Sequence, residues 1–87
     1  MKKFNLAFQY QRYLERCCLK ESEMNTIQKV ETKRAFMGGC GQMLLLLRDD
    51  LSELPTEDVA ADTLQSMLDE ANDFFAMEVI KYNLSPN

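Results

Sequence analysis

Apolar residues recur along this chain at the spacing of amphipathic helices in three stretches that are separated by polar or proline-containing segments. The spacing predicts helices over about 4–19, 26–52 and 57–82, followed by a frayed tail at 83–87. We therefore expect one all-α domain, residues 1–87, folded as a three-helix bundle. The second and third helices should pack antiparallel because their link is short, and the N-terminal helix should pack across them.

Each predicted helix has an apolar face that is expected to contribute to the core. The second helix carries apolar residues every seven positions, a pattern typical of a coiled-coil-like seam. The core faces are formed by Leu6, Tyr10, Tyr13, Leu14 and Cys17 in the first helix, by Val30, Met37, Leu44 and Leu51 in the second, and by Leu64, Met67, Leu68, Ala71, Phe74, Phe75 and Val79 in the third. Glu78 lies within the last of these stripes, so we expect it to be paired with a basic residue or to contact a ligand.

Local signals mark where the second helix begins and where the third one does. Asn25 followed by Gln28 resembles a capping box, with Asn in place of Ser or Thr. Pro55 cannot continue a helix and forces Leu54 out of helical geometry. Thr56 is then a suitable N-cap for the third helix.

Three glycines, Gly38, Gly39 and Gly41, interrupt the second helix, each at a cost of about 1 kcal/mol relative to alanine. Gly38, Gly39 and Gln42 share a face of small residues that would let another backbone approach. Further apolar side chains point away from the predicted core, namely Phe4, Phe8, Met77 and Ile80. We therefore expect a homo-oligomer with the glycine face at or near its interface. The alternative is a helix that kinks or breaks at the glycines.

Composition and charge narrow the functional classes. The chain has no His and no catalytic motif, which argues against an enzyme, and its three cysteines cannot complete a structural zinc site. We expect no cofactor and no metal. Residues 1–34 carry eight basic and four acidic residues, and residues 35–87 carry two and ten. This asymmetry suits either mutual neutralisation within the fold or an anionic ligand at the basic end.

The sequence also bears on where in the cell the protein acts and on whether it binds DNA. The longest apolar run, 43–47, is far too short for a membrane span, and the N-terminal residues do not resemble a signal peptide. We therefore expect a cytoplasmic protein that does not bind membranes. The acidic net charge of −4 and the lack of a dense basic stripe disfavour binding to DNA.

The segment from Gln28 to Gly39, continuing to Gln42, resembles small helical proteins of phages and prophages. Those proteins carry a Gln-x-x-Glu-x-Lys/Arg-Arg-Ala-Phe-x-Gly/Ala-Gly stretch, and most have no assigned function. The resemblance covers roughly residues 24–52, about a third of the chain, and this chain is richer in glycine than the pattern requires. It implies a phage-type accessory protein acting in the host cytoplasm.

Two modes of action are consistent with this resemblance. The first is binding and sequestration, as a counter-defence sponge for a nucleotide-type signal of the host or as an inhibitor of a host protein. The alternative is a structural or scaffold component in virion assembly. For the first mode, the predicted ligand contacts are Tyr10, Tyr13, Lys33, Arg34, Gly38, Gly39 and Gln42.

Overall fold

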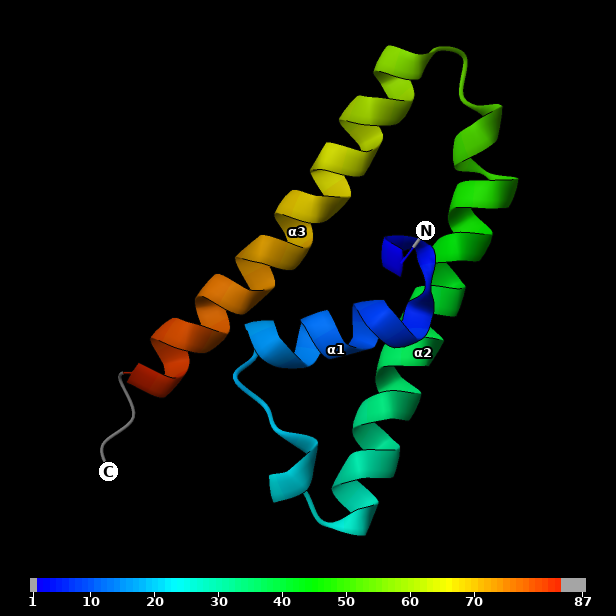
Figure 1. Cartoon of the computed structure of the whole chain (residues 1–87). Coiled ribbons are helices and arrows are strands. Elements are labelled where there is room, and N and C mark those ends of the chain that lie inside the picture. Colours follow the sequence, from blue (N-terminus) through cyan, green and yellow to red (C-terminus); the bar gives the residue numbers. More distant parts are fainter. Residues whose placement is uncertain (1, 84–87) are drawn as a thin grey trace. The chain divides into compact units, whose positions relative to one another are not determined.

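The computed structural model describes the backbone of residues 2–83 and the side chains of residues 2–81, and its regular elements are all helical. This confirms the predicted all-α class with three helices (Figure 1). The elements in chain order are η1 (Lys2–Phe4), α1 (Leu6–Arg16), η2 (Glu21–Glu23), α2 (Thr26–Asp49), η3 (Leu51–Glu53) and α3 (Glu57–Asn83), where η denotes a 3-10 helix. Asn83 closes α3, and the rest of the predicted frayed tail, 84–87, lies outside the described residues.

The chain divides into two compact units, residues 1–48 and residues 49–87. The first contains η1, α1, η2 and nearly all of α2, and the second contains η3 and α3. The predicted single domain and the predicted antiparallel packing of the second and third helices both require contacts between these units. Both stay predictions.

Helix α1 is shorter at both ends than its apolar pattern predicted, because polar caps set its bounds. The side-chain oxygen of Asn5 accepts a hydrogen bond from the backbone nitrogen of Phe8 at 3.1 Å, so α1 begins at the following Leu6. At the other end Leu19 N donates to the carbonyl of Leu14 and Cys18 N to that of Glu15, the two hydrogen bonds of a Schellman motif. This motif ends the helix at Arg16.

Helix α2 is continuous through its three glycines, so the alternative of a kinked or broken helix is not observed (Figure 1). The predicted cap is confirmed, because the side-chain oxygen of Asn25 accepts a hydrogen bond from Gln28 N at 2.8 Å. The helix ends at Asp49, three residues before its predicted end. A 3-10 turn follows, and Leu54 is extended as the residue before Pro55 should be.

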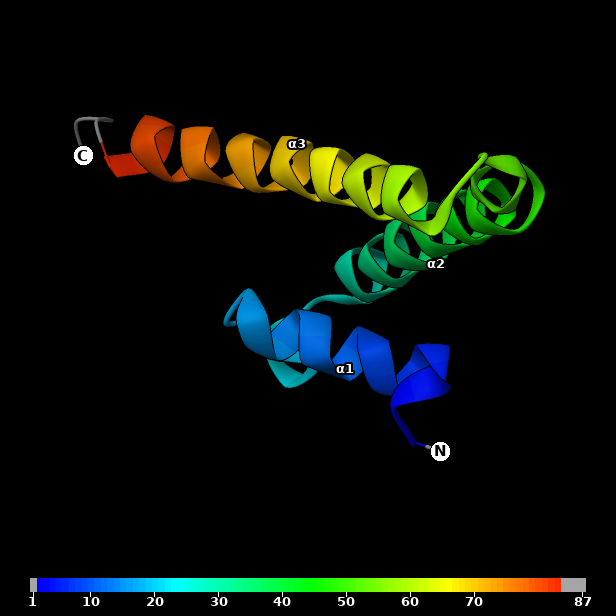
Figure 2. The ribbon, with the colours of Figure 1, turned by 90° about the horizontal axis from the view of Figure 1, so that it is seen from above.

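Helix α3 begins where its local signals predict and runs without a break to Asn83 (Figure 2). The hydroxyl of Thr56 accepts a hydrogen bond from Val59 N at 3.1 Å, which confirms Thr56 as the cap. Glu57 and Asp58 lie in the first turn, where the helix dipole favours acidic side chains.

A small core holds the first unit together. Tyr10, Leu14 and Met24 are buried, and Phe36 and Met37 of α2 pack against them, together with Tyr13. Helix α1 therefore lies across α2, as Figure 1 shows. Burying an apolar side chain of this size contributes about 2 kcal/mol, so three such residues form a core of modest strength.

The second unit contains no buried residue among those described, 49–81. Most of the apolar stripe that the sequence assigned to the core of the bundle is exposed. Exposed fractions range from 44% to 60% for Leu64, Leu68, Phe74, Phe75 and Val79. Nothing within the described part of the second unit covers this stripe, and its predicted packing against the other helices stays a prediction. Periodicity shows which face of a helix is apolar, but a covering element has to come from elsewhere in space.

Candidate binding surface

All seven residues predicted to contact a ligand belong to the first unit. Tyr10 and Tyr13 lie on α1, whereas the other five, Lys33, Arg34, Gly38, Gly39 and Gln42, lie on α2. The structure separates them into a buried aromatic group and an exposed group.

The two tyrosines of the aromatic group pack α1 against α2. The ring of Phe36 lies 5.2 Å from the ring of Tyr10 and 5.3 Å from that of Tyr13, measured between centroids, and both pairs are tilted. Tyr10 is only 2% exposed and Tyr13 is half-buried. The faces of these tyrosines are thus used for packing, and Tyr10 has no free face on which a base could stack.

The hydroxyl of Tyr10 is buried without a hydrogen-bond partner. Burial raises the pKa of Tyr10 above its ordinary value of 10.0, and the negative charge of Glu21 raises it further. The Glu21 carboxylate itself accepts a hydrogen bond from the side chain of Gln11 at 3.1 Å. The pKa of Tyr13 is also raised, by burial first and then by a hydrogen bond with the Cys17 thiol.

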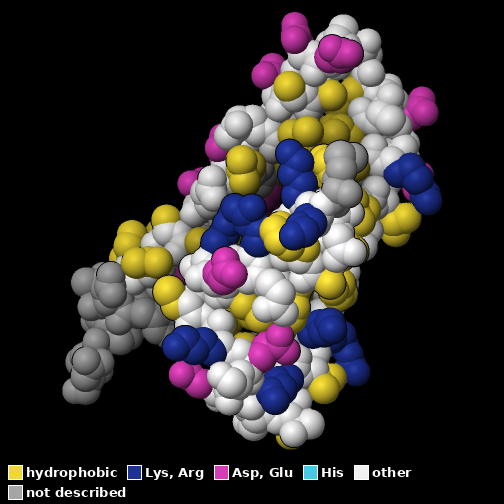
Figure 3. All heavy atoms as spheres, viewed as in Figure 1, with side chains coloured by type: hydrophobic (Ala, Val, Ile, Leu, Met, Phe, Trp, Pro, Cys, Tyr) yellow, Lys and Arg dark blue, Asp and Glu magenta, His cyan; other side chains and the backbone are white. Residues whose placement is uncertain are grey.

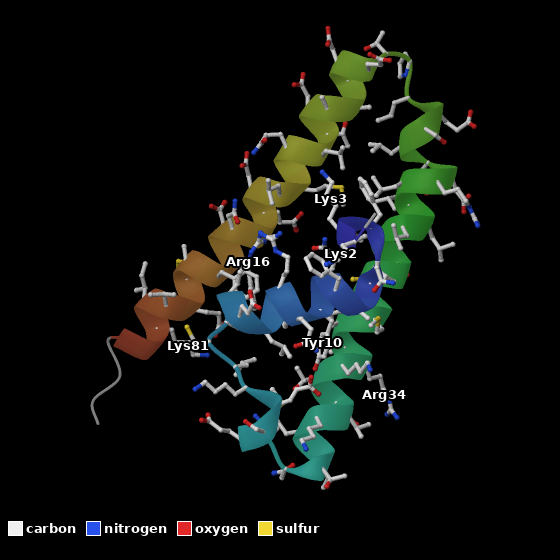
Figure 4. All side chains as sticks on the ribbon, in the orientation of Figure 1. Lys2, Lys3, Tyr10, Arg16, Arg34 and Lys81 are labelled. Atoms are coloured by element: carbon white, nitrogen blue, oxygen red, sulfur yellow. The ribbon has the colours of Figure 1, made fainter. Side chains whose placement is uncertain are left out.

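The second group forms an exposed row along α2. Arg34, Gly38 and Gln42 are spaced by four residues, so they follow one another along the same face of the helix. Phe36 and Gly38 are two residues apart, which places them about 160° apart around the helix axis. In Figure 4, Arg34 projects from α2 on the side away from Tyr10. The seven residues therefore do not converge on one pocket, and their contacts with a ligand stay predictions.

The cationic residues of this group are accessible. Lys33 is exposed, and Arg34 forms a salt bridge with Glu31 at 3.4 Å in which both side chains are well exposed. An exposed pair three residues apart on a helix contributes only a few tenths of a kcal/mol. Arg34 could therefore exchange Glu31 for an anionic ligand at little cost.

The glycines of α2 have no neighbour that requires their small size. A Cβ atom added at Gly38, Gly39 or Gly41 would meet nothing within 4 Å. Within the described part of the chain, close packing therefore gives no reason for glycine at these three positions, and glycine has a lower helix propensity than alanine.

A second feature of α2 is wider than the sequence predicted, because that prediction placed only Leu45 and Leu46 beside the glycine face and Leu44 and Leu47 in the core. Residues 43–47 are five consecutive apolar residues, which at 100° per residue surround the helix on all sides. None is buried, and Met43, Leu44, Leu45 and Leu47 are between 36% and 50% exposed. A helix segment that is apolar all round is normally enclosed by protein. We call residues 43–47 the apolar segment of α2. The unbroken run of apolar residues could have indicated it.

The structure shows neither a metal centre nor a membrane span within its described residues. No three Cys, Asp or Glu side chains in that part of the chain lie close enough together to hold a metal ion. None of the described helices combines the length and apolar character that crossing a membrane requires.

Comparisons with known proteins complete the description of this surface. No protein-family model, no curated protein and no solved structure matches this chain.

Proposed function

We propose that this chain is a non-enzymatic, phage-type accessory protein that binds and sequesters a host protein through the apolar segment of α2. The observation that carries the proposal is the all-round apolar character of residues 43–47 together with their exposure. The absence of His and of any catalytic motif supports a binding role. The resemblance of residues 24–52 to small phage proteins supports the biological setting.

The size of the exposed surface suits a contact with another protein. The side chains of Met43, Leu44, Leu45 and Leu47 together expose roughly 350 Å² of apolar area, in the range of patches that mark interaction sites. Such a patch would form the apolar centre of an interface whose rim is polar.

The charge of the first unit favours an acidic partner. Residues 1–48 carry nine basic and four acidic residues, a net charge of +5. Lys33 and Arg34 lie on the same helix as the apolar segment and are exposed. A partner with acidic residues around an apolar patch would therefore be attracted over a long range and then held by apolar burial.

Native mass spectrometry on protein purified from extract of its host cell tests this proposal. We expect a complex whose additional mass is that of one protein in a fixed ratio to the chain. Leu45→Glu places a carboxylate in the apolar segment and should remove that partner. Gln28→Glu is the matched control, because it adds the same charge at an exposed position of α2 outside the segment.

Two results would contradict the proposal. One is a chain that carries no partner protein under these conditions. The other is a complex that survives Leu45→Glu as fully as Gln28→Glu, because the apolar segment would then not be the contact.

A small anionic ligand of nucleotide type is a second candidate, favoured by the exposed cations Lys33 and Arg34 and by the open space beside Gly38. In this case native mass spectrometry would show an added mass of a few hundred daltons instead of a protein. Arg34→Gln should then weaken binding of that ligand about tenfold or more, because a charge-assisted hydrogen bond is lost. Unchanged affinity in Arg34→Gln, measured by calorimetry, would contradict this candidate.

A further inference from the structure

We draw no further inference here: the strongest candidate, the hydrophobic patch along α3 (Figure 3) to which Leu64, Leu68, Phe74 and Phe75 contribute, carries none because nothing in the structure shows what covers it.

Discussion

At the level of single residues, Tyr10 is the most completely buried of the described side chains and carries an unsatisfied polar atom. Its ring packs on Phe36, whereas its hydroxyl has lost water without gaining a hydrogen bond. A buried polar group without a hydrogen bond lowers the free energy of unfolding by about 1–3 kcal/mol. The same side chain therefore stabilises the first unit through its ring and destabilises it through its oxygen.

Tyr10→Phe should consequently raise the free energy of unfolding by about 1 kcal/mol, because it keeps the ring and removes the unpaired hydroxyl. Urea denaturation monitored by circular dichroism measures this change. Leu14→Ala serves as the comparison and should lower stability by about 3 kcal/mol, since it leaves a cavity in the same core. A loss of stability in Tyr10→Phe would show that the hydroxyl has a partner in solution.

The raised pKa of Tyr10 also predicts a dependence on pH. Because the folded pKa lies above 10.0, the unfolded chain loses the phenolic proton first as the pH rises. The protonated Tyr10 hydroxyl contributes fully to the free energy of unfolding below about pH 10. This contribution is lost as the pH rises through the folded pKa. Tyr13, whose pKa is raised as well, acts in the same direction.

Denaturation curves collected between about pH 8 and pH 11 test this dependence. The wild-type chain should lose stability at the alkaline end, and Tyr10→Phe should lose less. If the free energy of unfolding depended on pH identically in the two proteins, the alkaline loss of stability would not come from Tyr10.

Cys18 occupies a backbone conformation that suits glycine better than cysteine. Its φ of 55° lies in the left-handed region, at the position of the Schellman motif where glycine usually occurs. Cys18→Gly should raise thermal stability by about 1 kcal/mol, because the steric cost of the Cβ atom disappears. Cys17→Gly is the control, since φ there is −88° and the substitution should destabilise the chain. Equal effects at both positions would argue against strain at Cys18.

At the level of elements, α1, α2 and α3 each begin at a side-chain cap, but α2 contains more glycine than a helix tolerates freely. Asn5, Asn25 and Thr56 each accept a hydrogen bond from a backbone nitrogen three residues later. Each such cap contributes about 1 kcal/mol. These caps and the neighbouring packing keep α2 continuous despite its three glycines.

Gly39→Ala tests the role of the glycine face. Because a new Cβ atom meets nothing within 4 Å, the substitution should stabilise α2 in the isolated chain by about 1 kcal/mol. Thermal denaturation at low protein concentration measures this effect. The opposite result, a destabilised chain, would mean that another backbone approaches α2 at Gly39 even in dilute solution.

At the level of the whole molecule, the balance between core and surface is unusual for a chain of 87 residues. Three apolar residues are buried in the first unit and none among the described residues of the second. Phe4, Phe8, Met77 and Ile80, which the sequence placed on outward faces, are indeed exposed. A chain of this length with so little core is expected to be marginal when alone.

Association should therefore contribute to stability. The melting temperature is expected to rise by several degrees over a roughly hundredfold increase in protein concentration, because a dimer stabilises the folded chain by mass action. Differential scanning calorimetry at a series of concentrations measures this shift. A melting temperature independent of concentration would show that the chain unfolds as a monomer.

The sequence alone determined the helical class, the caps at Asn25 and Thr56, and the exposure of the outward apolar residues. The caps depend on residues that lie within one turn of each other, and the helical class and the outward faces depend on the periodicity of single helices. Both kinds of feature can therefore be predicted from the sequence without knowing which helices meet. The continuity of α2 was not decided by its glycines, because helix propensity is a weak term against the rest of a long helix.

Only the tertiary structure decided which apolar faces are covered. It buried Tyr10 against Phe36, so that Tyr10 became part of the core, and it separated both tyrosines from the exposed row at Arg34 and Gly38. Within the described part of the second unit, it left Leu64, Leu68, Phe74 and Phe75 of α3 exposed. Burial depends on which elements meet in space, and periodicity within one helix carries no information about its partner.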